Sequence, residues 1–135
     1  MLRIPRDAWI LVADGGSARL FRNVGSGGQV RLHQEEAMAL DPAEGVMPAA
    51  LPSEVHAREM DEASFARQLA QRINHDALHD RYRHLVIAAD PQTLGQIRAQ
   101  LNEQARARVV AEVPRNYTNT TREEIERAVA KVVEQ

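Results

Sequence analysis

The sequence predicts an α/β fold: a five-stranded mixed sheet in a ribonuclease-H-like βββαβαβα order, with helices covering the sheet. Two observations lead to this class. The apolar runs Trp9–Ala13 and Leu85–Ala89 are typical of central strands buried on both faces, and helical spacing alternates with strands in the second half of the chain. Hairpins make the first three strands antiparallel, and right-handed crossovers make the later strands parallel to the first. We therefore expect strand order 3-2-1-4-5.

Turn residues separate the first three strands. Asp14-Gly15-Gly16 follows the first apolar run and supplies residues that adopt a positive φ, so residues 17–22 are expected to return as the second strand of a hairpin. A second glycine-rich turn, at residues 25–28, leads to a third strand at Val30–His33. Its alternation puts one face inward and one in water, and we expect it near a sheet edge.

A long loop is expected at about residues 41–60, because three prolines and a glycine interrupt any steady period. The first helix should then begin at Asp61, where a negative charge favours the helix dipole. Its core face repeats every fourth residue, at Phe65, Leu69 and Ile73.

Three more elements follow the Leu85–Ala89 strand. Asp90-Pro91 is a cap followed by proline at the first helical position, so a helix should begin there. A strand is expected at residues 108–113, where Pro114 stops it. Residues 121–124 form a capping box that begins the final helix. Residues 1–135 should form a single domain with no internal repeat.

Composition narrows the class of protein. The chain has 135 residues, 44% hydrophobic and 27% charged, which suits one ordinary globular domain. It has no cysteine, so disulfides, thiolate metal sites and cysteine nucleophiles are excluded. The apolar run at residues 8–13 is too short for a signal peptide or a membrane span, so we expect a cytoplasmic protein with no membrane partner. The net charge of -2 means that nucleic-acid binding would need a local basic patch.

Three stretches in order resemble a known family: Trp9–Phe21 with its strand-Asp-Gly-strand opening, Phe65–Ala70, and His84–Ala89 running on through Leu94-Gly95 to Arg108–Val113. Together they resemble the bacterial host attachment proteins, described as required for attachment to host cells. They are also similar, more distantly, to the middle domain of archaeal and eukaryotic peptide-chain release factors. The resemblance covers nearly the whole chain outside the expected loop. It implies a non-enzymatic binding module that contacts the translation machinery, with an indirect effect on attachment.

One motif of the release factors is out of place here. Those proteins carry a Gly-Gly-Gln tripeptide between the third strand and the first helix, where it reaches the peptidyl-transferase centre. In this chain Gly27-Gly28-Gln29 comes one strand too early, in a turn where glycines have an ordinary conformational role. The loop that corresponds to the release-factor loop ends at 54–59 without a tripeptide. Peptide release by that mechanism is therefore not expected.

Arginine supplies almost all the positive charge, since Lys131 is the only lysine. Guanidinium groups suit planar phosphate recognition, so arginines on a shared face would bind ribosomal RNA. The alternatives are a solvated helix surface balanced by Asp76, Asp80 and Glu103, or a protein partner on which the long loop folds. Tyr117 would either stack on a base or cover the core. The candidate binding residues are Arg67, Arg72, Arg98, Arg115, Tyr117, His56 and Arg58.

Two constellations suggest metal chemistry instead. Asp14 and Asp90 should end neighbouring strands, and Glu62 could join them to hold Mg²⁺ or Mn²⁺ in a phosphodiester hydrolase. Each aspartate also has a structural explanation, as a hairpin residue or a helix cap. His75 and His79 have the one-turn spacing of zinc proteases, but no third ligand is apparent. The leading hypothesis assigns no catalytic residue and no cofactor, and the sequence does not predict an oligomeric state.

Overall fold

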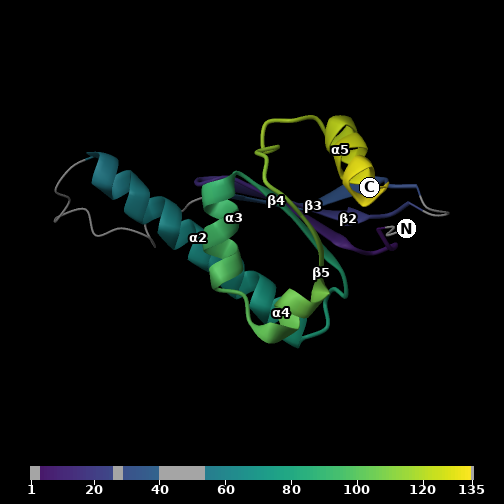
Figure 1. Cartoon of the computed structure of the whole chain (residues 1–135), viewed down its shortest axis with the longest axis horizontal. Helices are drawn as coiled ribbons and strands as arrows, with labels where there is room; N and C mark the ends of the chain where they lie inside the picture. Colours follow the sequence, from purple (N-terminus) through teal and green to yellow (C-terminus); the bar gives the residue numbers. More distant parts are fainter. Residues whose placement is uncertain (1–3, 26–28, 40–53, 135) are drawn as a thin grey trace.

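The sheet is the centre of the fold in the computed structural model, which describes residues 4–25, 29–39 and 54–134 and, within the last range, the side chains of 63–131. Its strand order is β3-β2-β1-β4-β5, and Figure 1 shows the sheet at the middle of the molecule between the helices. The β1–β2 and β2–β3 pairs are antiparallel, and the β1–β4 and β4–β5 pairs are parallel. The predicted α/β class, ribonuclease-H-like arrangement and strand order are confirmed. The strands are β1 (Trp9–Ala13), β2 (Ser17–Asn23), β3 (Leu32–Ala39), β4 (Leu85–Ala89) and β5 (Val109–Val113).

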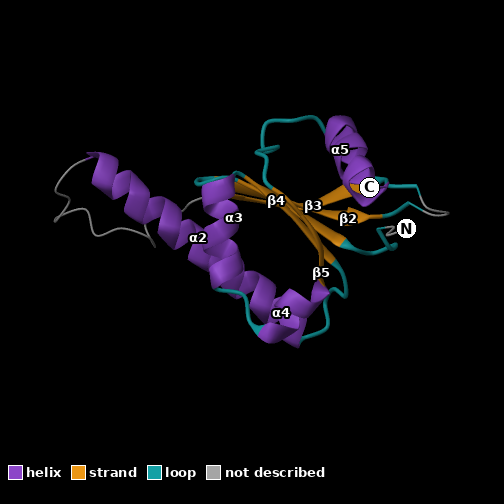
Figure 2. Cartoon of the chain, in the orientation of Figure 1, coloured by secondary structure: helices purple, strands orange, loops and turns teal. Residues whose placement is uncertain are grey.

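Helices cover both faces of this sheet, and Figure 2 shows the sheet between them. Three helices pack on one face and α5 packs on the other. Among the described residues, every helix is too short or too polar to cross a membrane. The helices are α2 (Glu54–Leu78), α3 (Pro91–Ala99), α4 (Glu103–Arg108) and α5 (Arg122–Glu134).

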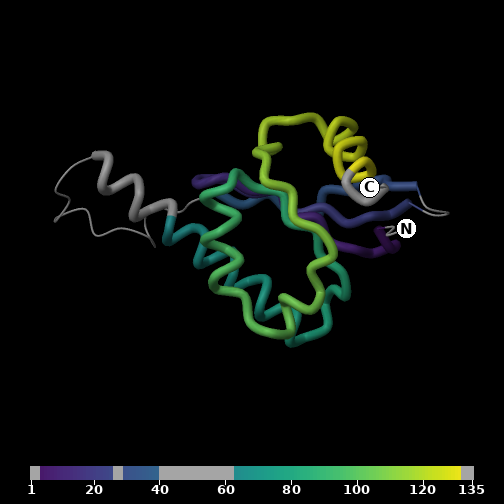
Figure 3. Tube along the Cα trace, viewed as in Figure 1, coloured from purple at the N-terminus to yellow at the C-terminus, as the bar shows by residue number. Residues whose placement is uncertain are grey.

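Alternation along the two central strands divides the core into two clusters. Leu11 of β1 and Ile87 of β4 face α2 and α3, whereas Ile10 and Val86 face α5. Successive side chains of a strand point to opposite faces, so a continuous apolar run buries both sides. Figure 3 shows how β1 and β4, far apart in sequence, lie together at the middle of the sheet.

Three elements differ from the sequence predictions. Helix α2 begins at Glu54 and not at Asp61, so the predicted loop ends too late; no proline or glycine follows Pro52 before the helix, and residues 54–60 are mostly good helix formers. The rest of that expected loop lies outside the described residues. The prediction also missed α4, a short helix that Asn102 caps by accepting from the N–H of Ala105 at 2.8 Å.

The third strand is longer than predicted and lies further along the chain. It spans Leu32–Ala39, whereas Val30–His33 was expected. The polar residues 34–36 break the apolar–polar alternation that would predict a strand. They are tolerated because β3 is an edge strand whose side chains are mostly exposed on both faces. The prediction that it lies at a sheet edge is confirmed.

A buried asparagine holds the turn between β2 and β3. Asn23 is 1% exposed, and its side-chain oxygen accepts from the N–H groups of Gly25 and Arg31 at 3.0 and 3.1 Å. Its amide donates to the carbonyls of Ile4 and Pro5, both at 3.1 Å. At Gly25 a Cβ atom would lie 2.1 Å from the carbonyl oxygen of residue 29, so only glycine fits this close approach.

Replacing Asn23 with alanine should lower the free energy of unfolding by about 2–4 kcal/mol, because four backbone groups, some of them buried, lose their hydrogen-bond partner. Urea unfolding followed by circular dichroism measures this loss. Asn119→Ala is the matched control, since Asn119 is exposed. It should change stability by less than about 0.5 kcal/mol. Equal losses in the two variants would contradict this role of Asn23.

Tyr82 closes the core below the amino ends of β1 and β4. Its hydroxyl donates to the carbonyl of Ile73 at 3.0 Å, and its ring stacks on Trp9 with centroids 4.8 Å apart. The Arg108 guanidinium lies over the ring at 5.7 Å and donates to the Tyr82 carbonyl. Burial raises the pKa of Tyr82 to about 12, with Asp76 adding to the rise and Arg108 opposing it.

The raised pKa of Tyr82 predicts a loss of stability in alkali. Because the unfolded phenol ionises near 10.0 and the folded one near 12, its contribution is complete below pH 10 and falls as the pH rises towards 12. Tyr82→Phe should lose about 1 kcal/mol at neutral pH and should lack this fall. Denaturant unfolding of both proteins at a series of pH values tests it. If the free energies of unfolding of the two proteins differ by the same amount at every pH up to 12, Tyr82 ionises as freely in the folded protein as in the unfolded one, and the prediction is wrong.

Candidate functional site

The carboxyl edge of the sheet brings the two predicted aspartates to neighbouring strand ends. Ala13 of β1 is paired with Ala89 of β4, so Asp14 and Asp90 each follow a residue of the same register pair. Strand β5 ends beside them, since Val113 pairs with Ala88. The loop that leads from β5 to α5, residues 114–121, therefore begins at this edge.

Asp14 is surrounded by hydrogen-bond donors of the protein itself. Its Oδ1 accepts from the N–H groups of Gly16 and Ser17, both at 2.8 Å, and from the Ser17 hydroxyl at 3.2 Å. Its Oδ2 accepts from the Thr118 hydroxyl at 2.6 Å. Burial by itself would raise the pKa of Asp14, but these four hydrogen bonds outweigh it and lower the pKa below its usual 3.8. The charged carboxylate thus ties the β1–β2 hairpin to the loop before α5.

Three further hydrogen bonds fix the same loop. Arg19 of β2 donates to the carbonyls of Thr118 and Thr120, at 3.3 and 2.7 Å. The Thr118 N–H donates to the side-chain oxygen of Asn116 at 2.9 Å. The Thr118 hydroxyl also lies 2.7 Å from that oxygen, but it has one proton and the Asp14 carboxylate is the stronger acceptor. The β5–α5 loop is therefore held in one conformation by the first hairpin of the chain.

Asp90 acts as a helix cap. Its Oδ2 accepts from the N–H of Thr93 at 3.2 Å, and Pro91 follows at the first helical position. The predicted start of this helix is confirmed. The Asp90 Oδ1 is buried and has no partner within the part of the chain that the structure describes.

The described residues form neither of the predicted metal sites. Asp14 and Asp90 each have a structural role, and the side chain of Glu62 lies outside the described residues. Residues 4–25, 29–39 and 63–131 contain no group of three or more metal-binding side chains that could share an ion. His75 and His79 have ring centroids 4.2 Å apart, with the His79 Nδ1 2.8 Å from the His75 carbonyl oxygen. The Mg²⁺ or Mn²⁺ hydrolase and the zinc site remain untested predictions.

Two of the predicted binding arginines are already paired within the protein. Arg72 contacts Glu36 at 2.9 Å and the buried Asp76 at 2.8 Å. The hydrogen bonds that Arg72 donates to these two carboxylates, first to Glu36 and then to Asp76, raise the pKa of Arg72. Arg98 binds Glu112 in a bidentate pair, at 3.0 and 2.6 Å. These pairs match the solvated, charge-balanced alternative more closely than a free binding surface.

The other predicted binding residues fall into three groups. Arg67 and Arg115 are exposed and form no ion pair with any described residue. Tyr117 is half-buried and packs against the core cluster that α5 covers. His56 and Arg58 belong to helix α2 and not to a loop, and their side chains lie outside the described residues.

Two grooves flank helix α5. One, of about 650 Å³, lies between α5 and the beginning of the β5–α5 loop. Its polar lining is mostly basic, with Arg115 from the loop and Arg127 and Lys131 from the helix. The sequence analysis did not assign the two helix residues to a site, although their spacing of four residues puts them on one helix face. We call this hollow the α5 groove. Its lining residues are Glu112, Val113, Pro114, Arg115, Tyr117, Glu124, Arg127, Ala128 and Lys131.

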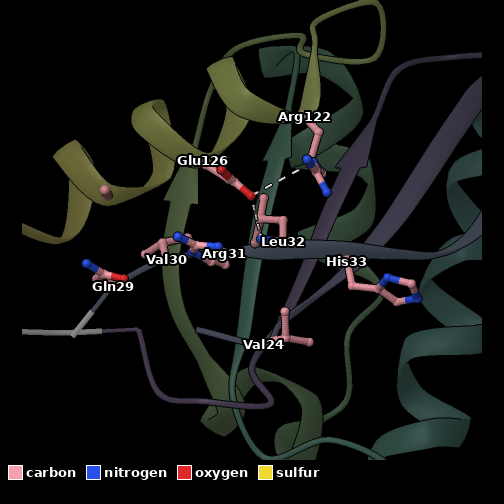
Figure 4. A pocket seen from close by; sticks show the side chains of 9 residues that line it. Val24, Gln29, Val30, Arg31, Leu32, His33, Arg122 and Glu126 are labelled. Atoms are coloured by element: carbon pink, nitrogen blue, oxygen red, sulfur yellow. Dashed lines mark hydrogen bonds and ion pairs between the residues drawn. The ribbon is translucent and has the colours of Figure 1, made fainter. Parts of the chain in front are cut away.

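The second groove, of about 620 Å³, lies between α5 and the β2–β3 turn. In Figure 4 Glu126 points from α5 towards β3, where its carboxylate accepts from the N–H of Leu32 at 2.7 Å. Arg122 lies 4.0 Å from the same carboxylate. Gln29 also lines this groove, so the glutamine of the Gly-Gly-Gln sequence lies by β3 and α5.

The chain folds into a three-layer α/β domain with a structured loop at the carboxyl edge of its sheet. The chain belongs to the family described as bacterial archaeo-eukaryotic release factor family 12, which matches residues 7–129. The predicted resemblance to release factors is therefore confirmed, whereas the host attachment name remains a prediction. A comparison with curated proteins found no match.

The link from Asp14 to the loop can be tested through acid stability. Because the folded pKa of Asp14 is lowered, its charge stabilises the fold at every pH above 3.8, and this contribution disappears as the pH falls through the lower folded value. Asp14→Asn keeps the shape but not the charge, so its stability deficit should be constant near neutral pH and vanish in acid. Asp14→Ala should lose about 1–3 kcal/mol through its lost hydrogen bonds.

Urea unfolding of the three proteins at a series of pH values measures both effects. Arg6→Ala serves as the control for a charge change, since Arg6 is exposed. A deficit of Asp14→Asn that persists unchanged below pH 3 would contradict the lowered pKa.

Proposed function

We propose that this protein is a non-enzymatic binding module that associates with the ribosome in the cytoplasm. The observation that carries the proposal is the family match, which extends over residues 7–129 and so includes the sheet, the edge and most of α5. A domain of release-factor type has its natural setting in translation. Any effect on attachment to host cells would then be indirect, through the synthesis of other proteins.

The β5–α5 loop supports a binding role. It leaves the sheet edge at Pro114, and its anchors on Asp14 and Arg19 keep it in place without a ligand. A loop that is ordered before binding loses less conformational entropy on association. Arg115 lies at the start of this loop and is exposed, so its guanidinium is available to a phosphate.

The hydrogen bonds at the carboxyl edge of the sheet favour a binding role over a catalytic one. Both oxygens of Asp14 accept hydrogen bonds from protein donors, so the carboxylate is committed to positioning the loop. Gly27 and Gly28 lie outside the described residues, but the turn to which they belong joins β2 to β3. The release-factor tripeptide acts from a different connection, so peptide release is not part of this proposal.

Sedimentation with purified ribosomes across a series of salt concentrations tests the proposal. The wild-type protein should co-sediment at low salt and dissociate as salt rises, because contacts to phosphates release counterions. Arg115→Ala should weaken binding at each salt concentration and lower the slope of log K against log salt by about 1. Arg83→Ala is the matched control, since Arg83 is also exposed but lies just before β4, at the amino edge of the sheet.

The control variant should bind like the wild type. Absence of the wild-type protein from the ribosome pellet at low salt would overturn the proposed function. Equal weakening by Arg83→Ala and Arg115→Ala would leave ribosome association standing but would refute the carboxyl edge as the binding surface.

A further inference from the structure

We propose that the α5 groove binds single-stranded RNA, with Arg115, Arg127 and Lys131 contacting phosphates and the Tyr117 ring stacking on a base. This inference rests on the proposed function for its biological setting, and it adds the site and the class of ligand. The proposed RNA site extends beyond the β5–α5 loop, because two of its three cations, Arg127 and Lys131, lie on helix α5.

The groove has the size and lining of a ligand site. Its volume of about 650 Å³ lies within the usual range for small-molecule and cofactor pockets. Val113, Pro114 and Ala128 contribute apolar surface, and Tyr117 adds the only aromatic ring among its lining residues. The tyrosine is half-buried against the core, so its ring is held in place and does not have to be ordered on binding.

The charges in the groove are unbalanced in favour of cations. Arg115, Arg127 and Lys131 are all exposed and take part in no ion pair with a described residue. Of the two acids that line the groove, Glu112 is occupied by the bidentate pair with Arg98. Glu124 is the remaining acid. A positive groove on a chain of net charge -2 is a local feature, and anions would be attracted there and not to the surface in general.

The arrangement of the cations fits an extended strand. Arg127 and Lys131 are four residues apart on α5, which puts them on one face and about 6 Å apart along the helix axis. Two cations at this repeat can contact successive phosphates. Arg115 comes from the β5–α5 loop, two residues before Tyr117, so the loop and the helix both contribute cations to the groove. Cations along a groove with an aromatic stacking surface are the usual elements of single-strand recognition.

The other hollow beside α5 is less suited to an anion. The Glu126 carboxylate projects into it, and Arg122 already contacts Glu123 at 3.1 Å as well as lying near Glu126 (Figure 4). An acidic protein segment is the other conceivable ligand of the α5 groove. It would use the cations but would have no need of a fixed aromatic ring, and for that reason we favour RNA.

Fluorescence anisotropy with a labelled single-stranded RNA oligonucleotide tests the inference on the full-length protein. Arg127→Ala and Lys131→Ala should each weaken binding and reduce the salt slope by about 0.7, the value for one contact to a single strand. Tyr117→Leu keeps an apolar side chain over the core but removes the stacking surface. It should weaken binding about 5-fold to 100-fold with an unchanged salt slope.

Arg106→Ala is the matched control for Arg127→Ala, since both residues are exposed helix arginines and Arg106 lies on α4, across the sheet. It should bind RNA like the wild type. Thermal melting of each variant, with the Tyr117→Phe protein as a further variant that retains an aromatic ring, separates lost binding from lost folding. Tyr117→Phe should bind nearly as well as the wild type.

Each outcome decides a different point. Wild-type binding of poly-glutamate with no binding of RNA would overturn the choice of ligand. RNA binding that none of the groove substitutions weakens would overturn the site. Oligonucleotide binding that depends on the groove, together with failure to sediment with ribosomes, would leave this inference standing and refute only the proposed function.

Discussion

The parallel pairing of β1 with β4 is the constraint on which the rest of the molecule depends. Both strands are buried on both faces, and their register sets Ile10 beside Val86 and Leu11 beside Ile87. One set of these side chains forms the core under α2 and α3, and the other forms the core under α5. A shift of one residue in either strand would exchange the two sets and place each against the wrong helices. The hairpin to β2 and the crossovers to β5 extend the sheet from this pair.

The same pairing builds the candidate site. Because β1 and β4 end at the same register pair, Asp14 lies at the carboxyl edge of the sheet. There it accepts a hydrogen bond from Thr118 and so fixes the loop after β5. Arg19, on the neighbouring strand, adds its contacts to the carbonyls of that loop. The loop in turn forms one wall of the α5 groove, and α5 forms the other. The chain thus uses a charged hydrogen-bonded residue at the carboxyl end of a central strand to position a basic surface at the same edge of the sheet.

The sequence predicted the parts of this architecture that local patterns determine. The apolar runs of β1 and β4, the Asp14 turn and the Asp90 cap were predicted because each signal lies within a few residues. The start of α2 and the length of β3 were missed, since prolines before Glu54 and polar residues within an exposed edge strand conceal them. The contact of Asp14 with Thr118, 104 residues away, was out of reach, as were the pairs of Arg72 with Glu36 and of Arg98 with Glu112. Such contacts arise only from tertiary packing.

Photochemical cross-linking of the protein to ribosomes in ultraviolet light tests the central claim most directly, because it reports which residues touch RNA without any substitution. Mass spectrometry of the cross-linked peptides should identify the stretch 115–117, where the tyrosine of the α5 groove is next to the sheet edge. Peptides from α5 that contain Arg127 or Lys131 would agree with the same surface. Cross-links confined to α3 and α4, on the opposite face of the sheet, would contradict the account.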